Sequence, residues 1–462
     1  MSAAATAAAL EPCDLLVDGG LVLTLDRSDR ILAEGVVAIR ADRIVAVEPA
    51  AAARARFAPL VRIDARRRIV MPGLVNTHNH TPLVITRGMV EDMNFAPMYT
   101  PRVPQGYRLG AEEVYHLSRL GAWDLLRTGS TTVVDYYRHG DSCARAMAEC
   151  GLRAFVGGRI HDIDLAAVAG GSYRYDPAIG AASLQENADI VARWHGRDGG
   201  RLRAVLTPHA PDTCSRELLG QVAAVAARSG TAVHTHLAQS PDEVAQVRRR
   251  DGRRPSEVLD EAGLLGPHVT AGHCIYLEPD EIARVGGARL NVAHVPIGNA
   301  SSGMMAPIKA LEEAGARITL ATDTKSHDLF ETMRAALAIN RVQGGGRTID
   351  ARAALRWATA GGAAAVGLAG EVGALAAGMK ADVILLDADA PNLRPIVDGV
   401  SLLVHAGVGA NVRTVIVDGR VLMDDGRPTR FDADEVVAAA QDVATRLWAE
   451  SGWSPVLAKP RA

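Results

Sequence analysis

Residues 70–80, Val-Met-Pro-Gly-Leu-Val-Asn-Thr-His-Asn-His, are the stretch of sequence that decides the fold. The segment begins as an apolar run typical of a fully buried strand and ends in two histidines two positions apart. Side chains alternate between the faces of a strand, so His78 and His80 point the same way and can bind one ion. An isolated His-x-His is more often a chance pair on a surface loop, so the rest of the chain has to decide its meaning.

The middle of the chain alternates short apolar segments with helix-like segments that end near glycine. The candidate strands are residues 71–80, 131–137, 153–160, 201–210, 232–239, 268–274, 289–295 and 317–323. Eight strands with helical crossovers in roughly 300 residues are typical of an α/β protein with a (β/α)8 barrel, or TIM barrel. A doubly wound sheet is the competing fold, but no Gly-x-Gly-x-x-Gly follows a predicted strand.

Short strands and turns occupy both ends of the chain, which predicts a second, smaller domain. The matching texture of the two ends predicts one composite β-sandwich domain from residues 13–70 and 369–431, with the barrel over 71–368 between them. Residues 432–462 are expected to form a C-terminal helix and tail, the helix covering residues 433–450.

Composition excludes several classes of function. A net charge of -3 argues against nucleic acid or an acidic membrane surface as the main partner. No apolar run is long enough to span a bilayer. The five cysteines have no close paired spacing, so neither a disulfide framework nor a zinc ribbon is indicated, and a cytoplasmic location is expected.

Further histidines and one aspartate fall at the ends of predicted strands, where the active sites of barrels form. These residues are His234 and His236, then His273, His294 and Asp323. Each one alone is more often structural. Together they offer the nitrogen and oxygen ligands of a catalytic zinc site, which keeps a position open for water.

These motifs resemble those of the amidohydrolase superfamily, and most of all its mononuclear branch of aminohydrolases and triazine chlorohydrolases. The resemblance is carried by His78-Asn79-His80 after Pro72-Gly73, HTHLA around His236, AGHC around His273 and ATD ending at Asp323. Binuclear members use a carboxylated lysine between two ions, but this chain has no lysine before Lys309. The resemblance therefore implies a single divalent metal ion, with zinc favoured over cobalt, iron or manganese.

The resemblance also implies a role for each residue. The implied metal ligands are His78, His80, His236 and Asp323, the implied catalytic residues are His273 and Asp323, and the expected substrate contacts are His209, Gln239 and His161. A small molecule is the expected partner, and a homo-oligomer the expected assembly.

One position departs from the resemblance. Deaminases of this branch place a glutamate three residues after the fifth-strand histidine, where it protonates a ring nitrogen, and this chain has Gln239 there. An amide cannot deliver a proton at pH 7. The sequence therefore favours hydrolysis, by metal-activated hydroxide, of a C–N or C–S bond in a neutral, hydrophobic amide, urea or (thio)carbamate, as in relatives similar to phenylurea and molinate hydrolases.

Two other functions stay open. The first alternative is deamination or dechlorination of a purine, pterin, pyrimidine or triazine ring. The remote one is a non-catalytic assembly protein, which is disfavoured because all four expected metal ligands are present.

An apolar segment after the opening motif, with Met89, Met93, Phe95, Met98 and Tyr99, is expected to cover the pocket. In the loop after Asp323, Lys325, His327 and Asp328 are interpreted as solvated charges without an assigned role.

Overall fold

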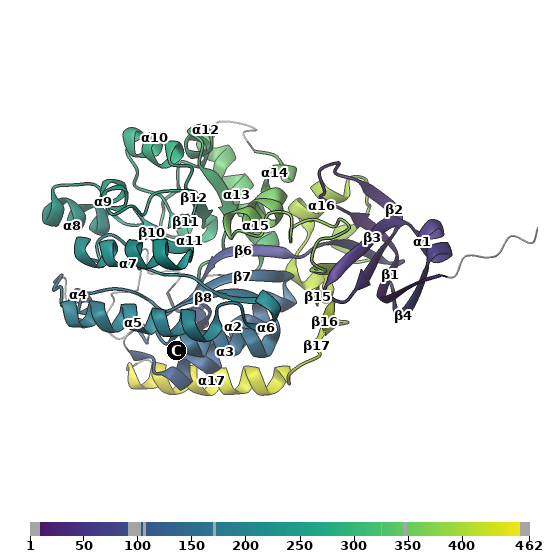
Figure 1. The fold of residues 1–462 in the computed structure, drawn as a ribbon, viewed down its shortest axis with the longest axis horizontal. Coiled ribbons are helices and arrows are strands. Elements are labelled where there is room, and N and C mark those ends of the chain that lie inside the picture. The colour runs from purple at the N-terminus through teal and green to yellow at the C-terminus, as the bar shows by residue number, and fades with distance from the viewer. Residues whose placement is uncertain are drawn as a thin grey trace, which may run out of the picture.

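The computed structural model describes residues 10–90, 103–104, 108–169, 172–324, 326–344 and 349–452. Within these residues the chain forms parallel strands surrounded by helices, and a mostly antiparallel sheet at one end of the molecule (Figure 1). Of the expected pocket cover, Met93, Phe95, Met98 and Tyr99 lie outside the described residues, as does Lys325.

Eight parallel strands form the centre of the larger part. They are β6 (Leu74–Asn79), β7 (Ser130–Tyr136), β8 (Arg153–Gly157), β9 (Leu202–Ala204), β10 (Val233–Leu237), β11 (Val269–His273), β12 (Asn291–His294) and β13 (Arg317–Leu320). They pair in sequence order as two four-stranded sheets, β6 to β9 and β10 to β13. Isolated parallel bridges, Leu206 with Val233 and Asn79 with Asp323, connect the two sheets on either side. The predicted α/β fold of the TIM-barrel type is confirmed. Each observed strand falls inside its predicted range, apart from β7, which begins one residue earlier, and the other seven are shorter than predicted.

Helices follow the strands and cover the outside of this part (Figure 1). They are η1 (Thr81–Thr86), α2 (Ala111–Arg127), α3 (Gly140–Cys150), α4 (Leu165–Ala169), α5 (Pro177–Trp194), α6 (Arg197–Gly200), α7 (Arg216–Ser229), α8 (Pro241–Asp251), α9 (Pro255–Glu261), α10 (Pro279–Gly287), α11 (Pro296–Ser301), α12 (Ile308–Glu313), α13 (Leu329–Gly344), α14 (Ala351–Arg356) and α15 (Gly362–Ala365). Helix α2 illustrates the local causes: Glu112 and Glu113 lie in its first turn and Arg127 in its last, which complements the helix dipole.

Nine strands from both ends of the chain form a single connected sheet. They are β1 (Glu11–Leu23), β2 (Ile31–Arg40), β3 (Arg43–Pro49), β4 (Phe57–Asp64), β5 (Arg68–Pro72), β14 (Val383–Asp387), β15 (Val412–Val417), β16 (Arg420–Asp424) and β17 (Arg427–Pro428), with helices α1 (Ala50–Arg56) and α16 (Gly399–Ala406) nearby. The two chain ends meet where β5 pairs antiparallel with β14. The domain boundaries at 13–70, 71–368, 369–431 and 432–462, and the sandwich form, stay predictions.

A buried ion network connects this sheet to the barrel strands. The guanidinium of Arg153, at the start of β8, donates to both carboxylate oxygens of Asp382, at 2.9 and 3.0 Å, and also to Asp418. Asp382 accepts a further bond of 2.9 Å from the backbone N–H of Asp418. Because Arg153 and Asp382 are both almost fully buried, this network fixes β8 against the strand pair β14–β15.

The C-terminal helix α17 (Ala433–Glu450) packs against α2, along the lower edge of the molecule in Figure 1. Its Val443, Leu447 and Trp448 share a hydrophobic cluster with residues of η1. The Trp448 indole N–H also donates to the backbone carbonyl of Ile85, at 2.8 Å. The far end of the chain therefore supports the segment that directly follows His80.

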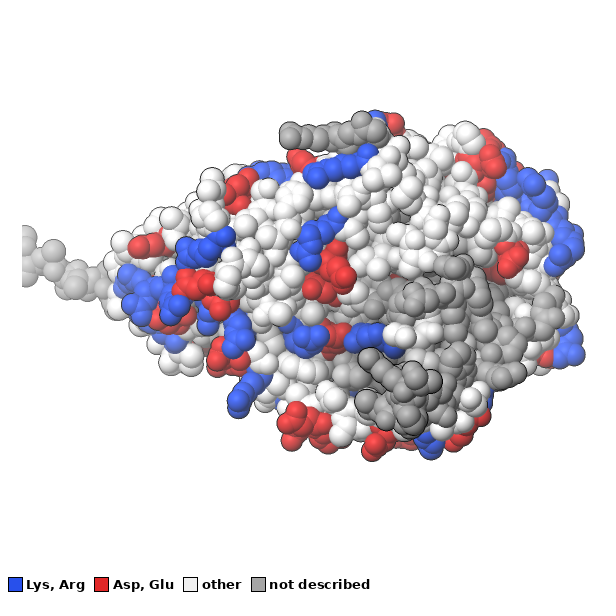
Figure 2. All heavy atoms as spheres, turned by 180° about the vertical axis from the view of Figure 1, so that it is seen from behind, with Lys and Arg blue, Asp and Glu red and all other residues white. Residues whose placement is uncertain are grey.

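Charged side chains of both signs are interspersed on the narrow end of the molecule, which the nine-stranded sheet forms (Figure 2). Many are paired, for example Arg54 and Arg62 with Asp18 and Arg66 with Asp64. Within the described part of the chain, every helix is too short or too polar to cross a membrane.

Candidate active site

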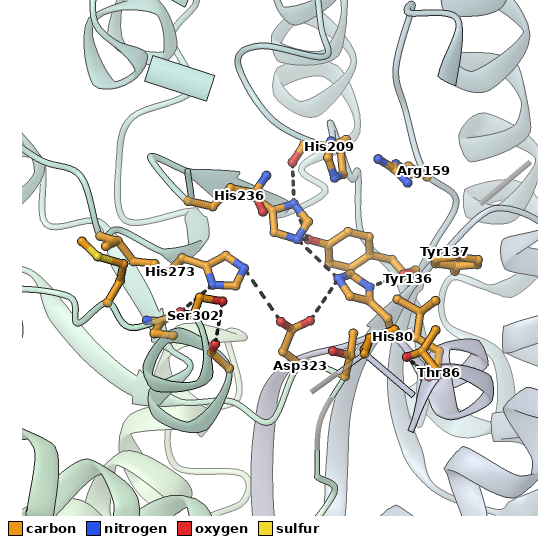
Figure 3. A pocket seen from close by; sticks show the side chains of 18 of the residues that line it. His80, Thr86, Tyr136, Tyr137, Arg159, His209, His236, His273, Ser302 and Asp323 are labelled. Atoms are coloured by element: carbon orange, nitrogen blue, oxygen red, sulfur yellow. Dashed lines mark hydrogen bonds and ion pairs between the residues drawn. The ribbon is translucent and has the colours of Figure 1, made fainter. Parts of the chain in front are cut away.

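A cavity opens at the carboxyl ends of the barrel strands, with an empty volume of about 1000 Å³ that includes its mouth. It is lined by His80, Leu83, Thr86, Val90, Tyr136, Tyr137, Arg159, His209, His236, Gln239, His273, Ile275, Tyr276, Gly298, Asn299, Ser302, Met304, Asp323 and Thr324. Figure 3 shows His273 facing Asp323 on one side, and His80 and Tyr136 on the other. Polar groups therefore converge at the floor of the cavity, and apolar side chains such as Leu83, Ile275 and Met304 form part of its walls.

His80 and His236 have the same hydrogen-bonding arrangement. His80 Nδ1–H donates to the carbonyl oxygen of Tyr136, at 2.7 Å, and His236 Nδ1–H donates to that of His209, at 2.6 Å. With Nδ1 protonated, the lone pair of each ring lies on Nε2. The two Nε2 atoms are 3.3 Å apart.

His78 lies beneath this pair and is fully buried. Its Nε2 has no hydrogen-bond partner among the described residues. Gly272 provides the space for its ring, because a Cβ at that position would lie 2.9 Å from His78 Cε1. A buried imidazole nitrogen that lacks a partner is the group that a metal ion would satisfy.

Asp323 and His273 complete the floor of the cavity. Asp323 Oδ1 lies 3.6 Å from His80 Nε2 and 3.8 Å from His78 Nε2. Asp323 Oδ2 lies 3.9 Å from His273 Nε2, too long for a direct hydrogen bond but suited to a shared water. The other ring nitrogen of His273 donates to Asn299 Oδ1, at 2.9 Å. Both residues have a left-handed backbone, with φ of +59° for Asp323 and +71° for His273, a strained conformation that is common at functional sites.

The cluster of His78, His80, His236 and Asp323 fits a divalent ion. Two nitrogens on one tetrahedral zinc lie about 3.4 Å apart when each bond is about 2.1 Å, and the His80 and His236 Nε2 atoms are 3.3 Å apart. Burial lowers the pKa of His78, His80 and His236, so these rings are neutral and available as ligands near pH 7. Ligand atoms of His78, His80 and Asp323 lie within 4.8 Å of one another, and so do those of His78, His236 and His273.

A buried carboxylate holds the turn that carries His80. Asp135, in β7, accepts from the backbone N–H and the hydroxyl of Thr81, both at 2.7 Å, and from Asn79 Nδ2, at 3.2 Å. On the helix side, Gly121 of α2 lets that helix approach, since a Cβ there would lie 2.7 Å from Thr81 Cβ. These contacts fix the orientation of the strand end.

The structure brings most of the expected residues together. His209 and Gln239, expected as substrate contacts, line the cavity with His80, His236, His273 and Asp323. The remaining expected contact, His161, is buried but does not line the cavity. His234 and His294 are strand-end histidines that also lie away from it.

Several lining residues carried no prediction. Tyr136 ends β7, so the same strand-end position that singled out the histidines could have identified it. Asn299 and Ser302 come from α11 and the turn after it, and Arg159 from the loop after β8, where no periodic pattern marks them.

Fold and site together define a barrel enzyme with a histidine–carboxylate cluster at its strand ends. The chain belongs to the amidohydrolase family, whose model matches residues 69–422. As a member of this family it acts on C–N bonds other than peptide bonds. The predicted superfamily is thereby confirmed.

Relatives over nearly the full length are deaminases. The chain is 34% identical over 442 residues to a 5-methylthioadenosine/S-adenosylhomocysteine deaminase of Pelotomaculum thermopropionicum, covering 94% of this chain and 99% of the relative. It is equally 34% identical to a 5'-deoxyadenosine deaminase of Methanosarcina barkeri, covering 94% and 98%.

Solved structures agree with the fold. An adenosine deaminase from Xanthomonas campestris with bound zinc has a TM-score of 0.84 at 29% identity, covering 95% of this chain and 99% of its own. Atrazine chlorohydrolase from Arthrobacter aurescens, complexed with zinc, has a TM-score of 0.81 at 23% identity, covering 93% and 100%, and supports the fold alone.

These relatives change the order of the expected functions. The sequence alone favours hydrolysis of an amide, urea or thiocarbamate, because Gln239 stands where the deaminases have glutamate. The named relatives support the alternative, ring deamination, better, and the likeness to phenylurea and molinate hydrolases finds no support among them.

Proposed function

We propose that this enzyme is a divalent-metal aminohydrolase that removes an exocyclic amino group from a purine ring of a nucleoside-like substrate and releases ammonia. The observation that carries the proposal is the convergence of the nitrogen and carboxylate ligands on one point of a partly apolar cavity. The 34% identity to nucleoside deaminases over 94% of the chain supports the choice of substrate.

In this proposal His78, His80, His236 and Asp323 hold the metal, for which the zinc-bound adenosine deaminase neighbour favours zinc. A bound divalent cation lowers the pKa of water and so supplies a nucleophile near neutral pH. The proposal includes a single metal ion, because the chain has no lysine before Lys309 that could bridge two ions.

The chain's own residues position water and move its protons. The gap of 3.9 Å between Asp323 Oδ2 and His273 Nε2 places both groups beside one water molecule. Asp323 accepts the first water proton as the ring carbon is attacked. His273, whose Nδ1–H donates to Asn299, presents the lone pair of Nε2 to the same water and accepts a hydrogen bond from it. The water supplies both protons that the reaction needs, one to a ring nitrogen and one to the leaving amine.

Gln239 holds the ring without acting as an acid. Its backbone N–H and that of Ala238 each donate to the buried Glu243 carboxylate at 2.8 Å, which fixes the turn that presents the side chain to the cavity. The amide N–H donates a hydrogen bond to a ring nitrogen, and Asp323 shuttles the proton. His209 Nε2, with no partner among the described residues, is a further substrate contact. His161 is buried and does not line the cavity, and its substrate contact stays a prediction.

Gln239 also favours a second candidate, hydrolysis of an amide, urea or thiocarbamate carbonyl, because such a reaction needs no ring protonation. Two readouts separate the candidates: ammonia release from adenine nucleosides, pterins and triazines, and release of an amine or thiol from N-substituted phenylureas and thiocarbamates. Ring deamination predicts ammonia from the adenine nucleosides and none from phenylureas, with Asp323→Asn inactive but folded by circular dichroism. Turnover confined to phenylureas or thiocarbamates would establish the second candidate.

A cytoplasmic location and a homo-oligomer are part of the proposal, and size-exclusion chromatography tests the oligomer.

A further inference from the structure

The carboxamide of Asn299 has a hydrogen-bond partner for its oxygen but none, among the described residues, for its nitrogen. Its Oδ1 accepts from His273 Nδ1–H at 2.9 Å, and this bond fixes the direction of the amide. Its Nδ2 has no partner among the described residues, although the side chain is only 2% exposed and lines the cavity. An unpaired buried donor is costly, so a group that binds in the cavity is expected to satisfy it.

Topology places this donor opposite Gln239. The strands β10, β11 and β12 are neighbours in one sheet. Gln239 follows β10, His273 ends β11, and Asn299 lies in α11 after β12. The two amide side chains that line the cavity therefore flank His273, one on each side.

A purine has acceptors that match this arrangement. Its amino-bearing carbon C6 lies between two ring nitrogens, N1 in the six-membered ring and N7 in the five-membered ring, and both carry lone pairs. An amide N–H is a donor suited to either nitrogen. A urea or thiocarbamate offers a single carbonyl and no such pair.

We propose that Asn299 Nδ2 donates a hydrogen bond to one of these two ring nitrogens and Gln239 Nε2 to the other, so that the two amides bracket the purine. This inference rests on the proposed deamination and makes the purine ring the specificity element of the site. Asn299 has a second role through Oδ1, which orients His273.

Binding of three nucleosides tests the bracket without turnover. The probes are 6-methylpurine ribonucleoside, which has no amino group to lose, and its 1-deaza and 7-deaza analogues, measured by calorimetry on the full chain with its metal. The wild type is expected to bind each deaza analogue about tenfold more weakly than the parent, the effect of one hydrogen bond.

The Asn299→Asp variant keeps the acceptor for His273 but has no N–H to donate. This variant is expected to bind one deaza analogue as tightly as the parent and the other still about tenfold more weakly, so that one penalty is lost and the other is kept. Gln239→Leu should show the reverse pattern. The penalty is the ratio of the dissociation constants of the deaza analogue and the parent nucleoside. The added charge of the aspartate affects the binding of both ligands and therefore largely cancels in this ratio. Asn299→Ala, which lacks both groups, gives the same ratios if the aspartate variant does not fold.

Asn340→Ala is the matched control, since this buried amide donates to Ala336 O in α13, away from the cavity. It should keep both penalties. Both penalties intact in Asn299→Asp would overturn the inference even if ammonia release proves the deamination. Tight, bracketed binding without ammonia release from adenine nucleosides would instead overturn the proposed function alone.

Discussion

At the scale of single residues, the proposed deamination assigns to Gln239 the hydrogen bond to a ring nitrogen of the substrate. The turn that carries it is held by Glu243, and the left-handed backbone of Ala238, with φ of +49°, directs it into the cavity. A hydrogen bond from an amide stabilises a ring but leaves the proton transfer to Asp323.

Exchange of this amide for an acid is therefore informative. Gln239→Glu is expected to raise kcat for adenine nucleosides by about tenfold or more, because a general acid in place contributes about 10² or more to a rate. Ammonia release under saturating substrate measures the change. An unchanged kcat would show that the side chain is only a spacer.

His294 makes stability depend on pH. Burial lowers its pKa to about 3, whereas an unfolded histidine titrates near 6.5. As pH falls below 6.5 the unfolded chain takes up a proton and the folded chain does not, so stability is lost over the range between 6.5 and 3. Between pH 6.5 and 5 this loss is about 2 kcal/mol.

Urea unfolding at pH 7 and pH 5 measures the effect. His294→Leu should lose about 2 kcal/mol less than the wild type between these pH values. The same exchange at the exposed His268 is the control and should not change the difference. An equal loss in wild type and His294→Leu would show that His294 is protonated in the folded state.

The sequence predicts site residues from their position at the ends of strands. The structure shows that this position alone is not sufficient to bring a residue into the cavity. His234 and His236 occupy same-face positions of β10, as the two histidines of the opening motif do, but only His236 lines the cavity. Asn299 lies in α11 and not at the end of a strand, so no periodic pattern in the sequence identifies it as a cavity residue.

At the scale of elements, η1 and α17 act as one unit. Residues Leu83 and Thr86 of η1 line the cavity, and Trp448 of α17 donates to the carbonyl of Ile85 between them. Helix α17 was predicted over its exact range of residues 433–450, because its amphipathic pattern is local. Its partner could not be predicted, since 363 residues separate the two hydrogen-bonded groups.

Loss of this bond should affect substrate binding. Trp448→Phe keeps an aromatic ring but has no N–H, so η1 is held less firmly and KM should rise about two- to tenfold, with kcat changed little. Steady-state kinetics measure both constants. Trp123→Phe is the control, because this buried tryptophan packs on Phe431 away from the cavity and should leave KM unchanged. Equal shifts in the two variants would contradict a specific role for Trp448.

At the scale of the whole molecule, the Arg153 network holds the two parts of the chain together. Its partners Asp382 and Asp418 come from the C-terminal strand region, so a single guanidinium bridges segments more than 200 residues apart, 229 for Asp382 and 265 for Asp418. Both carboxylates raise the pKa of Arg153, which stays charged although buried. The repeated texture of the two chain ends indicates that they meet, but the contact of Arg153 in the barrel with the C-terminal strand region has no local signal.

Removal of the arginine leaves the buried Asp382 carboxylate without its cation, whereas the partly buried Asp418 keeps Lys380 at 3.7 Å. Arg153→Ala should lower the free energy of unfolding by about 3–5 kcal/mol, measured by urea denaturation. Arg446→Ala, which breaks exposed pairs with Glu113 and Glu450, should cost under about 1 kcal/mol. Similar losses in the two variants would contradict a buried role for Arg153.

Metal-dependent ammonia release tests the central claim most directly. The enzyme is stripped with a chelator and reloaded with increasing zinc, and ammonia from an adenine nucleoside is measured against bound metal. The expected result is release that rises in proportion to occupancy and saturates at one ion per chain. Ammonia release that survives complete removal of metal, or a fully loaded enzyme that releases none from any adenine nucleoside, would contradict the account.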